Sequence, residues 1–213
     1  MSRAPRAVVL ANGVPPSPET ASAALDGASI FVCADGGANA AKTLGLLPIA
    51  IVGDFDSATR ETLAHFAAVP QLRDADPERT DTEKAIDFVL GKAAAAEITL
   101  LGASAGRLDH VLGHLSILRR YAGRARIVLE DDDARSWLAS GDVTIHVPVG
   151  TTVSFFAVGG PAARVTTEGF RYALTERTMA LGEQDSVSNV TTGAPARLRI
   201  GGGELLLVVV KRP

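Results

Sequence analysis

Short apolar runs alternate with longer, alanine-rich segments through about residue 139, and this alternation restricts the chain to a few architectures. The apolar runs span residues 7–11, 30–34, 49–52, 98–101 and 126–129, and the segments of helical character span residues 18–25, 38–44, 58–67, 82–95 and 109–121. Strands that alternate with helices imply βαβ units, in which the strands lie parallel. We therefore expect an N-terminal, mostly parallel α/β/α domain over residues 1–139.

The pattern changes after Gly141 to short β-type runs without helices between them. These runs span residues 143–147, 151–158, 163–167, 187–190, 197–200 and 204–210, and the clearest breaks fall at residues 159–161 and 201–203. Regular short strands separated by Gly, Pro and Asp turns predict an antiparallel sandwich. The expected fold is thus an α/β domain followed by a smaller antiparallel β-sandwich domain over residues 140–213.

Charge and cysteine content exclude several classes of protein. The 213 residues carry 24 acidic and 21 basic side chains, and the net charge of −3 gives no basic surface for nucleic acid. The single cysteine, Cys33, forms neither an internal disulfide nor a cysteine zinc cluster, and its apolar flanks predict a buried thiol. The segment before Asn12 is too short for a signal peptide, and no stretch approaches the roughly 20 apolar residues of a membrane span. We expect a cytoplasmic protein without a membrane or nucleic-acid partner.

Polar, glycine-bearing turns follow four of the first five predicted strands. These turns occupy residues 12–13, 35–39, 53–57 and 102–107. Ligands bind outside the carboxyl ends of the strands in an open parallel sheet, so a shared edge would gather Asp35, Asp54, Asp56 and Arg107 in one crevice. The alternative for any single turn is a loop that uses glycine only for its backbone geometry.

Asp54 and Asp56 are the sharpest candidates for a metal site. Two carboxylates on one tight turn can converge on a hard cation, and Mg²⁺ in phosphate-transfer sites typically takes one or two carboxylates plus substrate oxygens. The structural alternative is that Asp56 or Ser57 caps the helix that follows.

The segment from Thr80 to Lys84 opens the next predicted helix and also allows two interpretations. Either Thr80 or Asp81 caps this helix, which is locally sufficient. Alternatively, Asp81 is a third metal ligand and Lys84, one turn further along, contacts phosphate. The spacing alone leaves the two interpretations equal.

Residues 102–110 combine a small, flexible loop with a cationic side chain. Such a loop lets backbone N–H groups approach a phosphate at the start of a helix, and Arg107 supplies a bidentate donor. The chain has neither a Walker A loop nor a Gly-x-Gly-x-x-Gly fingerprint. Asp109 can cap the helix. We interpret His110 and His114 as hydrogen-bonded side chains and not as a metal pair.

A polar run from Asp185 to Asn189 interrupts an apparent strand of the second half. Its small hydroxyl and amide side chains can bind a polar heterocycle, or they can serve turn chemistry alone. The sequence favours neither interpretation.

Taken in order, these motifs resemble the thiamine pyrophosphokinase family. The matching stretches are LANG at 10–13, ADGGAN at 34–39, GDFDS at 53–57, TDTEKA at 80–85, GRLDH at 106–110 and SVSN at 186–189, and they span nearly the whole chain. The resemblance implies transfer of a pyrophosphoryl group from ATP to the hydroxyethyl group of thiamine, giving thiamine diphosphate and AMP. It also implies a homodimer that binds thiamine where the α/β domain of one subunit meets the β-domain of the other.

The resemblance also implies a role for each matching residue. Asp54, Asp56 and Asp81 are expected to bind Mg²⁺, and Asp109 is expected at the reacting hydroxyl or its metal. Contacts to the nucleotide or its phosphates are expected from Asn12, Asp35, Asn39, Lys84 and Arg107, and contacts to the aminopyrimidine ring of thiamine from Ser188 and Asn189. The catalytic set is then Asp54, Asp56, Asp81, Arg107 and Asp109.

Three positions depart from the pattern of that family. Ala105 stands in place of the first glycine of a pair, Pro77 and Glu78 replace a Gln-Asp or Lys-Asp pair, and His114 stands where asparagine is common. None of these departures removes an expected metal ligand.

Two rival functions use part of the same residues. A metal-dependent glycosyltransferase or phosphohydrolase would use Asp54 and Asp56 but explains neither residues 106–110 nor the β-domain. A non-catalytic nucleotide-binding regulator would need only the glycine turns.

Overall fold

The computed structural model describes residues 5–93 and 97–211. The chain divides into two compact units between Asp132 and Asp133. This division is N-terminal to the boundary expected at residues 139/140, and the expected boundary falls inside the strand β7 (Ala134–Ile145). The acidic run at residues 131–133 separates the units, whereas the apolar residues after it belong to a continuous strand. No helix within the described ranges is long and apolar enough to span a lipid bilayer.

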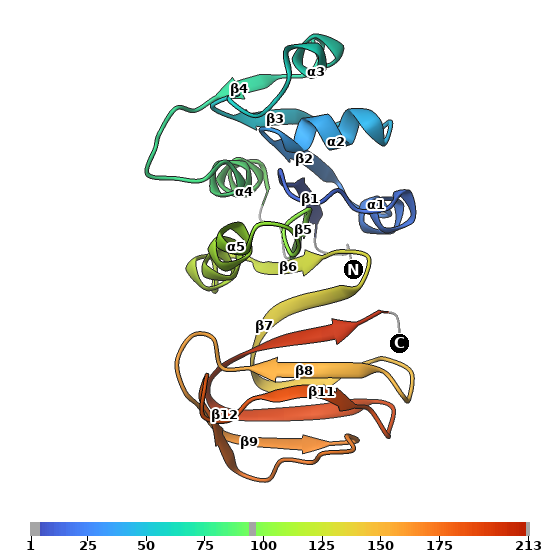
Figure 1. Ribbon diagram of the computed structural model, residues 1–213, viewed down its shortest axis with the longest axis vertical. Helices are drawn as coiled ribbons and strands as arrows, with labels where there is room; N and C mark the ends of the chain where they lie inside the picture. Colours follow the sequence, from blue (N-terminus) through green and yellow to red (C-terminus); the bar gives the residue numbers. More distant parts are fainter. Residues whose placement is uncertain (1–4, 94–96, 212–213) are drawn as a thin grey trace. The chain divides into compact units, whose positions relative to one another are not determined.

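A parallel sheet with helices on both faces forms the first unit, as the sequence predicts (Figure 1). Its strands are β1 (Arg6–Leu10), β2 (Ile30–Ala34), β3 (Ala50–Gly53), β4 (Gln71–Arg73), β5 (Glu97–Leu101) and β6 (Arg126–Glu130). They are ordered β6-β5-β1-β2-β3-β4, and each pairing is parallel. The helices are α1 (Pro18–Leu25), α2 (Gly37–Thr43), α3 (Arg60–His65), α4 (Asp81–Lys92) and α5 (Leu108–Arg120). Figure 1 shows α1 and α2 on one face of this sheet and α4 and α5 on the other.

Burial on both faces explains why these strands are continuous apolar runs. On one face, Val8, Leu10, Phe31 and Cys33 pack against small residues of two helices, Ala21 and Ala24 of α1 and Ala38 and Ala41 of α2. On the other, α4 packs against β1, β2 and β3 and buries Ala85, Ile86 and Val89. Cys33 lies fully inside this core, where burial raises the pKa of its thiol.

Two elements of this unit differ from the sequence prediction. The strand β4 was not predicted, because a three-residue edge strand with two exposed residues carries no apolar run. The helix expected over residues 82–95 ends at Lys92, and residues 94–96 lie outside the described part of the chain.

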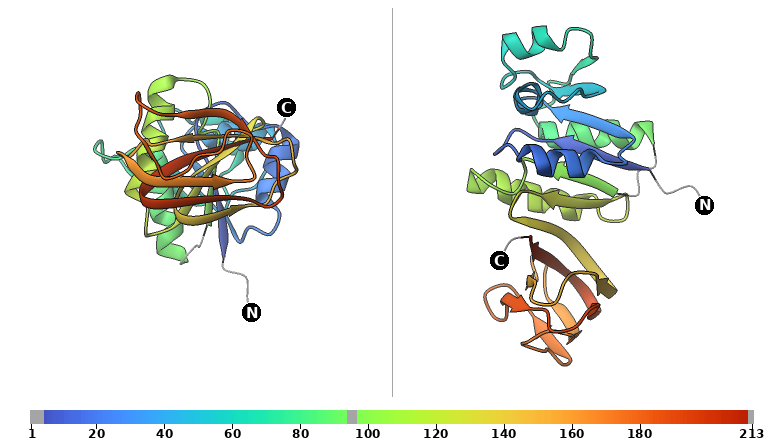
Figure 2. Two further views of the ribbon diagram at one scale, coloured as in Figure 1. Left: turned by 90° about the horizontal axis from the view of Figure 1, so that it is seen from below. Right: turned by 90° about the vertical axis from the view of Figure 1, so that its right-hand side faces the viewer.

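Antiparallel strands form the second unit. After β7 come β8 (Thr152–Phe156), β9 (Ala162–Glu168), β10 (Arg177–Met179), β11 (Ser186–Val190) and β12 (Ala196–Val210). The long β12, red in Figures 1 and 2, pairs with β7 along most of its length, with β9 near its start and with β8 near its end. The two strands predicted at 197–200 and 204–210 are therefore one strand, whose glycines allow a shift of register instead of a break. Its apolar residues Leu198, Leu205 and Leu207 enter one core with Phe155 and Met179.

Close contact between β1 and α2 yields a test of the first unit. A Cβ added at Gly37 would lie 2.0 Å from the backbone oxygen of Leu10, whereas one added at Gly91 would meet no atom within 4 Å. We expect Gly37→Ala to lower the free energy of unfolding by about 1–3 kcal/mol, because backbone must move to admit the methyl group. The control Gly91→Ala should raise it by up to about 1 kcal/mol, since alanine favours the helix. Urea unfolding measures both, and equal stabilities would contradict this packing.

Candidate active site

The loops after the parallel strands contact one another along a single edge of the sheet. Because β2 and β5 flank β1, the chain leaves β1 at a point where the strand order reverses, and ligands bind at such points. A Cβ added at Gly13 would lie 2.2 Å from the carbonyl oxygen of Gly102, and one added at Gly36 would lie 2.4 Å from the side chain of Asn12. Glycine is therefore required for loop-to-loop approach at this edge.

Three carboxylates from three elements meet at this edge. Asp35 follows β2, Asp54 follows β3 and Asp81 begins α4, and each offers an oxygen within 4.8 Å of the others. Asp35 is 1% exposed, while the other two are half-buried. Three hard oxygen donors at this spacing suit a divalent cation such as Mg²⁺. We call Asp35, Asp54 and Asp81 the cation cluster, after the kind of ion that their oxygens suit.

Asp35 is held in an uncommon backbone conformation, with φ at 40°. Its carboxylate accepts hydrogen bonds from the backbone N–H groups of Ser57 at 3.0 Å and Ala58 at 3.1 Å. Burial raises the pKa of Asp35, the two N–H groups oppose that rise, and the charge of Asp81 adds to it. Asp35 therefore both joins the cluster and fastens the loop that carries Asp54.

Asp56, predicted as a metal ligand, is not a member of the cluster that the described residues form. Its backbone N–H donates to Asp54 Oδ1 at 3.1 Å, and its carboxylate accepts the hydroxyl of Ser57 at 2.8 Å. The helix α3 is capped by Thr59, so neither Asp56 nor Ser57 takes the capping role that the sequence also allowed.

Asn39 is occupied by the same loop. Its amide donates to the carbonyl of Ser57 at 3.0 Å and accepts the N–H of Thr59 at 3.1 Å. The residue predicted as a nucleotide contact thus holds the loop after β3 in place.

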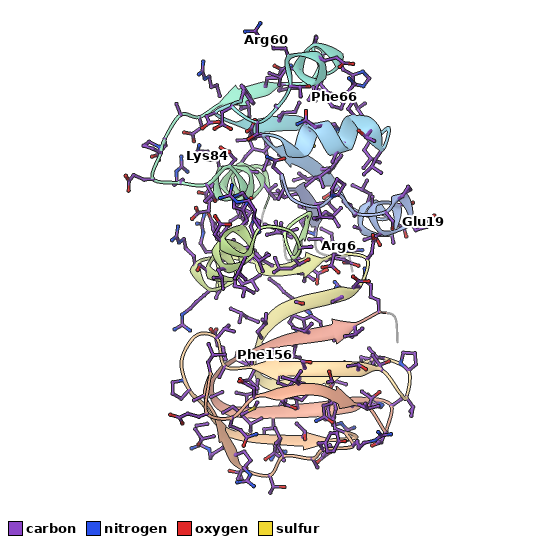
Figure 3. All side chains as sticks on the ribbon, in the orientation of Figure 1. Arg6, Glu19, Arg60, Phe66, Lys84 and Phe156 are labelled. Atoms are coloured by element: carbon purple, nitrogen blue, oxygen red, sulfur yellow. The ribbon has the colours of Figure 1, made fainter. Side chains whose placement is uncertain are left out.

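Thr80 resolves the ambiguity at the start of α4. Its hydroxyl accepts the N–H of Glu83, whose carboxylate in turn accepts the N–H of Thr80 at 2.9 Å, which is a complete capping box. Capping by Thr80 leaves Asp81 at the first helical position to face the cluster. Lys84, labelled in Figure 3 and 4% exposed, donates to Asp81 Oδ1 at 2.9 Å. A buried cation beside gathered carboxylates reduces their mutual repulsion.

Arg79 fixes the segment that leads to this cap, although it lies outside the motifs identified in the sequence. Its guanidinium contacts Asp74 at 2.7 Å, Asp76 at 2.9 Å and Asp87 at 3.3 Å. The pKa of Asp76 is lowered most by a backbone hydrogen bond from Glu78 and next by the hydrogen bond from the Arg79 side chain. The only sequence sign of this network is a basic residue among spaced acids, which is also typical of a solvated loop.

A cavity of about 310 Å³ lies over this edge. Its lining includes Asn12, Asp81, Asp109, His110 and His114, so it joins the cation cluster to the start of α5. A second hollow, of about 360 Å³, lies on the second unit between β7, β9 and β12, where the charged side chains are all exposed. The first cavity, with its buried polar groups, is the candidate active site.

Arg107 and Asp109 form an exposed ion pair at the entrance to α5. The guanidinium contacts the carboxylate at 2.6 and 3.1 Å, and it lowers the pKa of Asp109 to about 2. Asp109 is therefore ionised at neutral pH. A backbone hydrogen bond from His110 also lowers the pKa of Asp109. No side-chain hydrogen bond from the N-cap residue Arg107 caps α5.

Ser188 and Asn189 on β11 differ in what they can contact. Asn189 is 0% exposed. Its amide oxygen accepts the backbone N–H of Tyr172 at 3.0 Å, and its amide nitrogen donates to the carbonyl of Tyr172 at 2.8 Å. This side chain fastens a neighbouring segment to β11. Ser188 has an exposed side chain and a left-handed backbone, with φ at 55°.

Comparison with protein families matches both parts of the chain. Residues 21–129 match the model described as "Thiamin pyrophosphokinase, catalytic domain", and residues 142–200 match "Thiamin pyrophosphokinase, vitamin B1 binding domain". Thiamine pyrophosphokinase 1 of Oryza sativa subsp. japonica is 30% identical over 201 residues, which cover 81% of this chain and 76% of the relative. Thiamine pyrophosphokinase of Bacillus subtilis is 25% identical over 188 residues, covering 84% and 86%.

Solved structures share the fold. The crystal structure of the Bacillus subtilis thiamine pyrophosphokinase superposes with a TM-score of 0.87 at 22% identity and covers 98% of this chain and 100% of that one. The thiamin pyrophosphokinase of Geobacillus thermodenitrificans gives a TM-score of 0.84 at 25% identity, covering 97% and 98%.

Proposed function

Because the chain belongs to the thiamin pyrophosphokinase family, we propose that Asp35, Asp54 and Asp81 hold the Mg²⁺ of the family's reaction. That reaction transfers a pyrophosphoryl group from ATP to thiamine, giving thiamine diphosphate and AMP. The observation that supports the metal site is the convergence of three carboxylates from separate elements within 4.8 Å. A glycosyltransferase, a phosphohydrolase or a nucleotide-binding regulator accounts less well for a chain that matches both family domains.

The donor set suits the ion, since Mg²⁺ prefers carboxylate oxygens and substrate phosphates over nitrogen or sulfur ligands. When bound, Mg²⁺ neutralises negative charge on the phosphate oxygens of ATP. We propose Asp35 in place of the expected ligand Asp56, because the three converging carboxylates are those of Asp35, Asp54 and Asp81. The exposed side chain of Asp56 instead contacts Ser57 and Asp35. Asp54 and Asp81 remain ligands, as expected from the sequence.

Cationic and amide groups around the cluster are proposed to bind the phosphates of ATP. Lys84 is buried beside Asp81, and Arg107 ends the glycine-bearing loop after β5. Asn12 lines the cavity. Such groups stabilise charge that develops when an alcohol attacks the β-phosphorus and AMP departs, with little covalent work for the protein.

Asp109 is proposed to orient the hydroxyl of thiamine. It lines the cavity, and its low pKa, set by Arg107, keeps it an acceptor at neutral pH. An ionised carboxylate accepts a hydrogen bond from the attacking hydroxyl, although a pKa of about 2 makes it a weak base.

Substitution of single carboxylates tests the metal site. Asp35→Asn, Asp54→Asn and Asp81→Asn keep side-chain size but remove the charge that a hard cation requires, so AMP formation should fall by about 10²-fold or more. The matched control is Asp56→Asn, for which we expect a loss of less than about fivefold, since an amide can keep the contacts of this side chain to Ser57 and Asp35, and each such hydrogen bond is worth roughly 0.5–1.5 kcal/mol. The measurement is AMP produced per enzyme across a Mg²⁺ titration, with circular dichroism to verify folding. Normal turnover in the first three variants at low Mg²⁺ defeats the assignment, and a full loss in Asp56→Asn alone restores the pair Asp54 and Asp56.

Thiamine is proposed to bind with Ser188, and Asn189 is proposed to shape the strand that presents it. Ser188 has the exposed hydroxyl, whereas the amide of Asn189 is used within the protein. The two residues predicted together as ring contacts would then act by different routes.

Separate substitutions distinguish these two roles. Ser188→Ala should weaken thiamine affinity by about threefold to tenfold, the equivalent of one hydrogen bond, with the melting temperature and ATP affinity unchanged. Asn189→Ala should lower the unfolding free energy by about 1–3 kcal/mol, because backbone groups of Tyr172 lose their buried partner. Isothermal titration and thermal melts measure the two effects. If Ser188→Ala leaves thiamine affinity unchanged, the ring-binding role is wrong.

We propose that the protein is a homodimer in which one subunit's cavity and the other's second unit share thiamine. Exposed apolar side chains support this: Leu108 and Leu112 on α5, beside the cavity, and Tyr172, Leu181 and Val187 around β11. Exposed apolar groups of this kind mark protein contacts when they gather in a patch. We place the reaction in the cytoplasm, where its co-substrate ATP is available.

Dilution tests the shared site. If two subunits complete each site, specific activity should fall as the dimer dissociates, and Leu108→Glu with Leu112→Glu should give an inactive, folded monomer, because charged groups are unfavourable in an apolar contact. Light scattering under assay conditions reports the mass. A fully active monomer would contradict the shared site.

A further inference from the structure

His114, on the second turn of α5, is a buried residue whose two ring nitrogens both contact other elements. Its Nδ1 lies 2.7 Å from the carbonyl oxygen of Ala103, in the loop after β5. Its Nε2 lies 3.3 Å from the hydroxyl oxygen of Thr82, in the first turn of α4. One imidazole thus bridges the loop after β5 and the first turn of α4.

The partners fix the protonation pattern of this ring. A carbonyl oxygen only accepts hydrogen bonds, so Nδ1 carries the proton and donates to Ala103. In the neutral ring Nε2 is then an acceptor, and the hydroxyl of Thr82 donates to it. Burial, which lowers the pKa of His114, favours this neutral form.

The two hydrogen-bond partners of His114, Thr82 and Ala103, adjoin different parts of the site. Thr82 follows Asp81, a member of the cation cluster, and both residues line the cavity together with His114. Ala103 lies between Gly102, which approaches the loop after β1, and Ser104. The loop has a separate anchor in a hydrogen bond of 2.5 Å from Ser104 Oγ to Asp131. Loss of His114 therefore removes the link between loop and helix and leaves the loop attached to the sheet.

We propose that His114 is a positioning residue that holds the first turn of α4, with Asp81, in register with the phosphate-binding loop after β5. This inference rests on the proposed metal site at Asp35, Asp54 and Asp81. Misplacement of a reacting group by about 1 Å can reduce a rate by as much as 10²-fold, so a bridge between the cation cluster and the loop controls turnover without touching substrate.

Two conservative variants of His114 each remove one of its two hydrogen bonds and keep the other. In His114→Asn, the amide nitrogen occupies a position near Nδ1, so it keeps the bond to Ala103 but does not reach Thr82. In His114→Gln, the longer side chain reaches Thr82 with its carbonyl oxygen and gives up the bond to Ala103. Thr82→Val removes the hydroxyl while keeping the shape of the side chain. Ser116→Ala, an exposed change on the same helix whose hydroxyl bonds only to Leu112 in the described structure, is the control.

The experiment is a double-mutant cycle read by kinetics and by the imidazole nitrogens in NMR. We expect Thr82→Val and His114→Asn each to lower kcat by about tenfold and to raise the Mg²⁺ concentration for half-maximal rate, with KM for thiamine within about twofold. Thr82→Val added to His114→Asn should cause no further loss, because the bond is already absent. Without Mg²⁺ or ATP, the wild-type NMR spectrum should show the proton on Nδ1, and Thr82→Val should shift the Nε2 resonance alone. Ser116→Ala should match wild type in every measurement.

Equal losses from Thr82→Val in both backgrounds, unchanged Mg²⁺ dependence in His114→Asn, or a proton on Nε2 would each overturn the inference. The Mg²⁺ dependence separates a positioning role from poor folding. Partial unfolding lowers the apparent kcat but leaves the Mg²⁺ concentration for half-maximal rate unchanged. If Asp54→Asn abolishes turnover while the His114 variants behave as wild type, this inference alone is wrong. If Asp54→Asn remains active, the proposed metal site is wrong, whatever the His114 variants do.

Discussion

Repulsion among three carboxylates is the constraint on which the rest of this site depends. Asp35, Asp54 and Asp81 lie within reach of one ion, and like charges at such distances disfavour ionisation unless other groups oppose them. Two backbone N–H groups at Asp35 and the buried ammonium of Lys84 at Asp81 supply that opposition within the protein. A divalent cation would supply the remainder, which connects the fold of this edge to the chemistry of ATP.

The neighbouring loops are arranged to keep the carboxylates in place. Asp35 and Asn39 fasten the loop after β3, and Thr80 caps α4 so that Asp81 is not needed there. Glycines at the ends of β1, β2 and β5 let these loops touch, since an added Cβ at Gly13 would lie 2.2 Å from a backbone oxygen. The loops of this edge are thus held by backbone approach at the glycines and by side chains that bond to the backbone of a neighbouring loop.

The sequence predicted every helix and strand of the first unit except β4, because the apolar patterns that define these elements are local. The ranges of β2 and α1 were predicted to the residue. Parallel topology predicted that Asp35 and Asp54 lie at one sheet edge, together with Asp56 and Arg107, whereas Asp81 was expected there only as one of two interpretations and from the family resemblance. The short edge strand β4 and the continuous β12 were missed, because the first has little apolar content and the second passes through three glycines.

The finer geometry of the site depends on contacts that a local pattern does not contain. Whether Asp35 or Asp56 faces the cluster depends on backbone at positive φ, at Asp35 and at Phe55, which sets the direction of each side chain. The bridge from Thr82 through His114 joins residues 32 apart in the sequence. The sequence predicted hydrogen bonds for His114 but not their partners.

Anomalous diffraction from crystals grown with Mn²⁺ and a non-hydrolysable ATP analogue would locate the metal bound by these carboxylates, since Mn²⁺ accepts the same oxygen ligands as Mg²⁺. We expect an anomalous peak in contact with Asp35, Asp54 and Asp81, and its loss in Asp54→Asn crystals. A peak bound by Asp54 and Asp56 without Asp35 or Asp81, or no peak at this edge while the analogue is bound, would contradict this expectation.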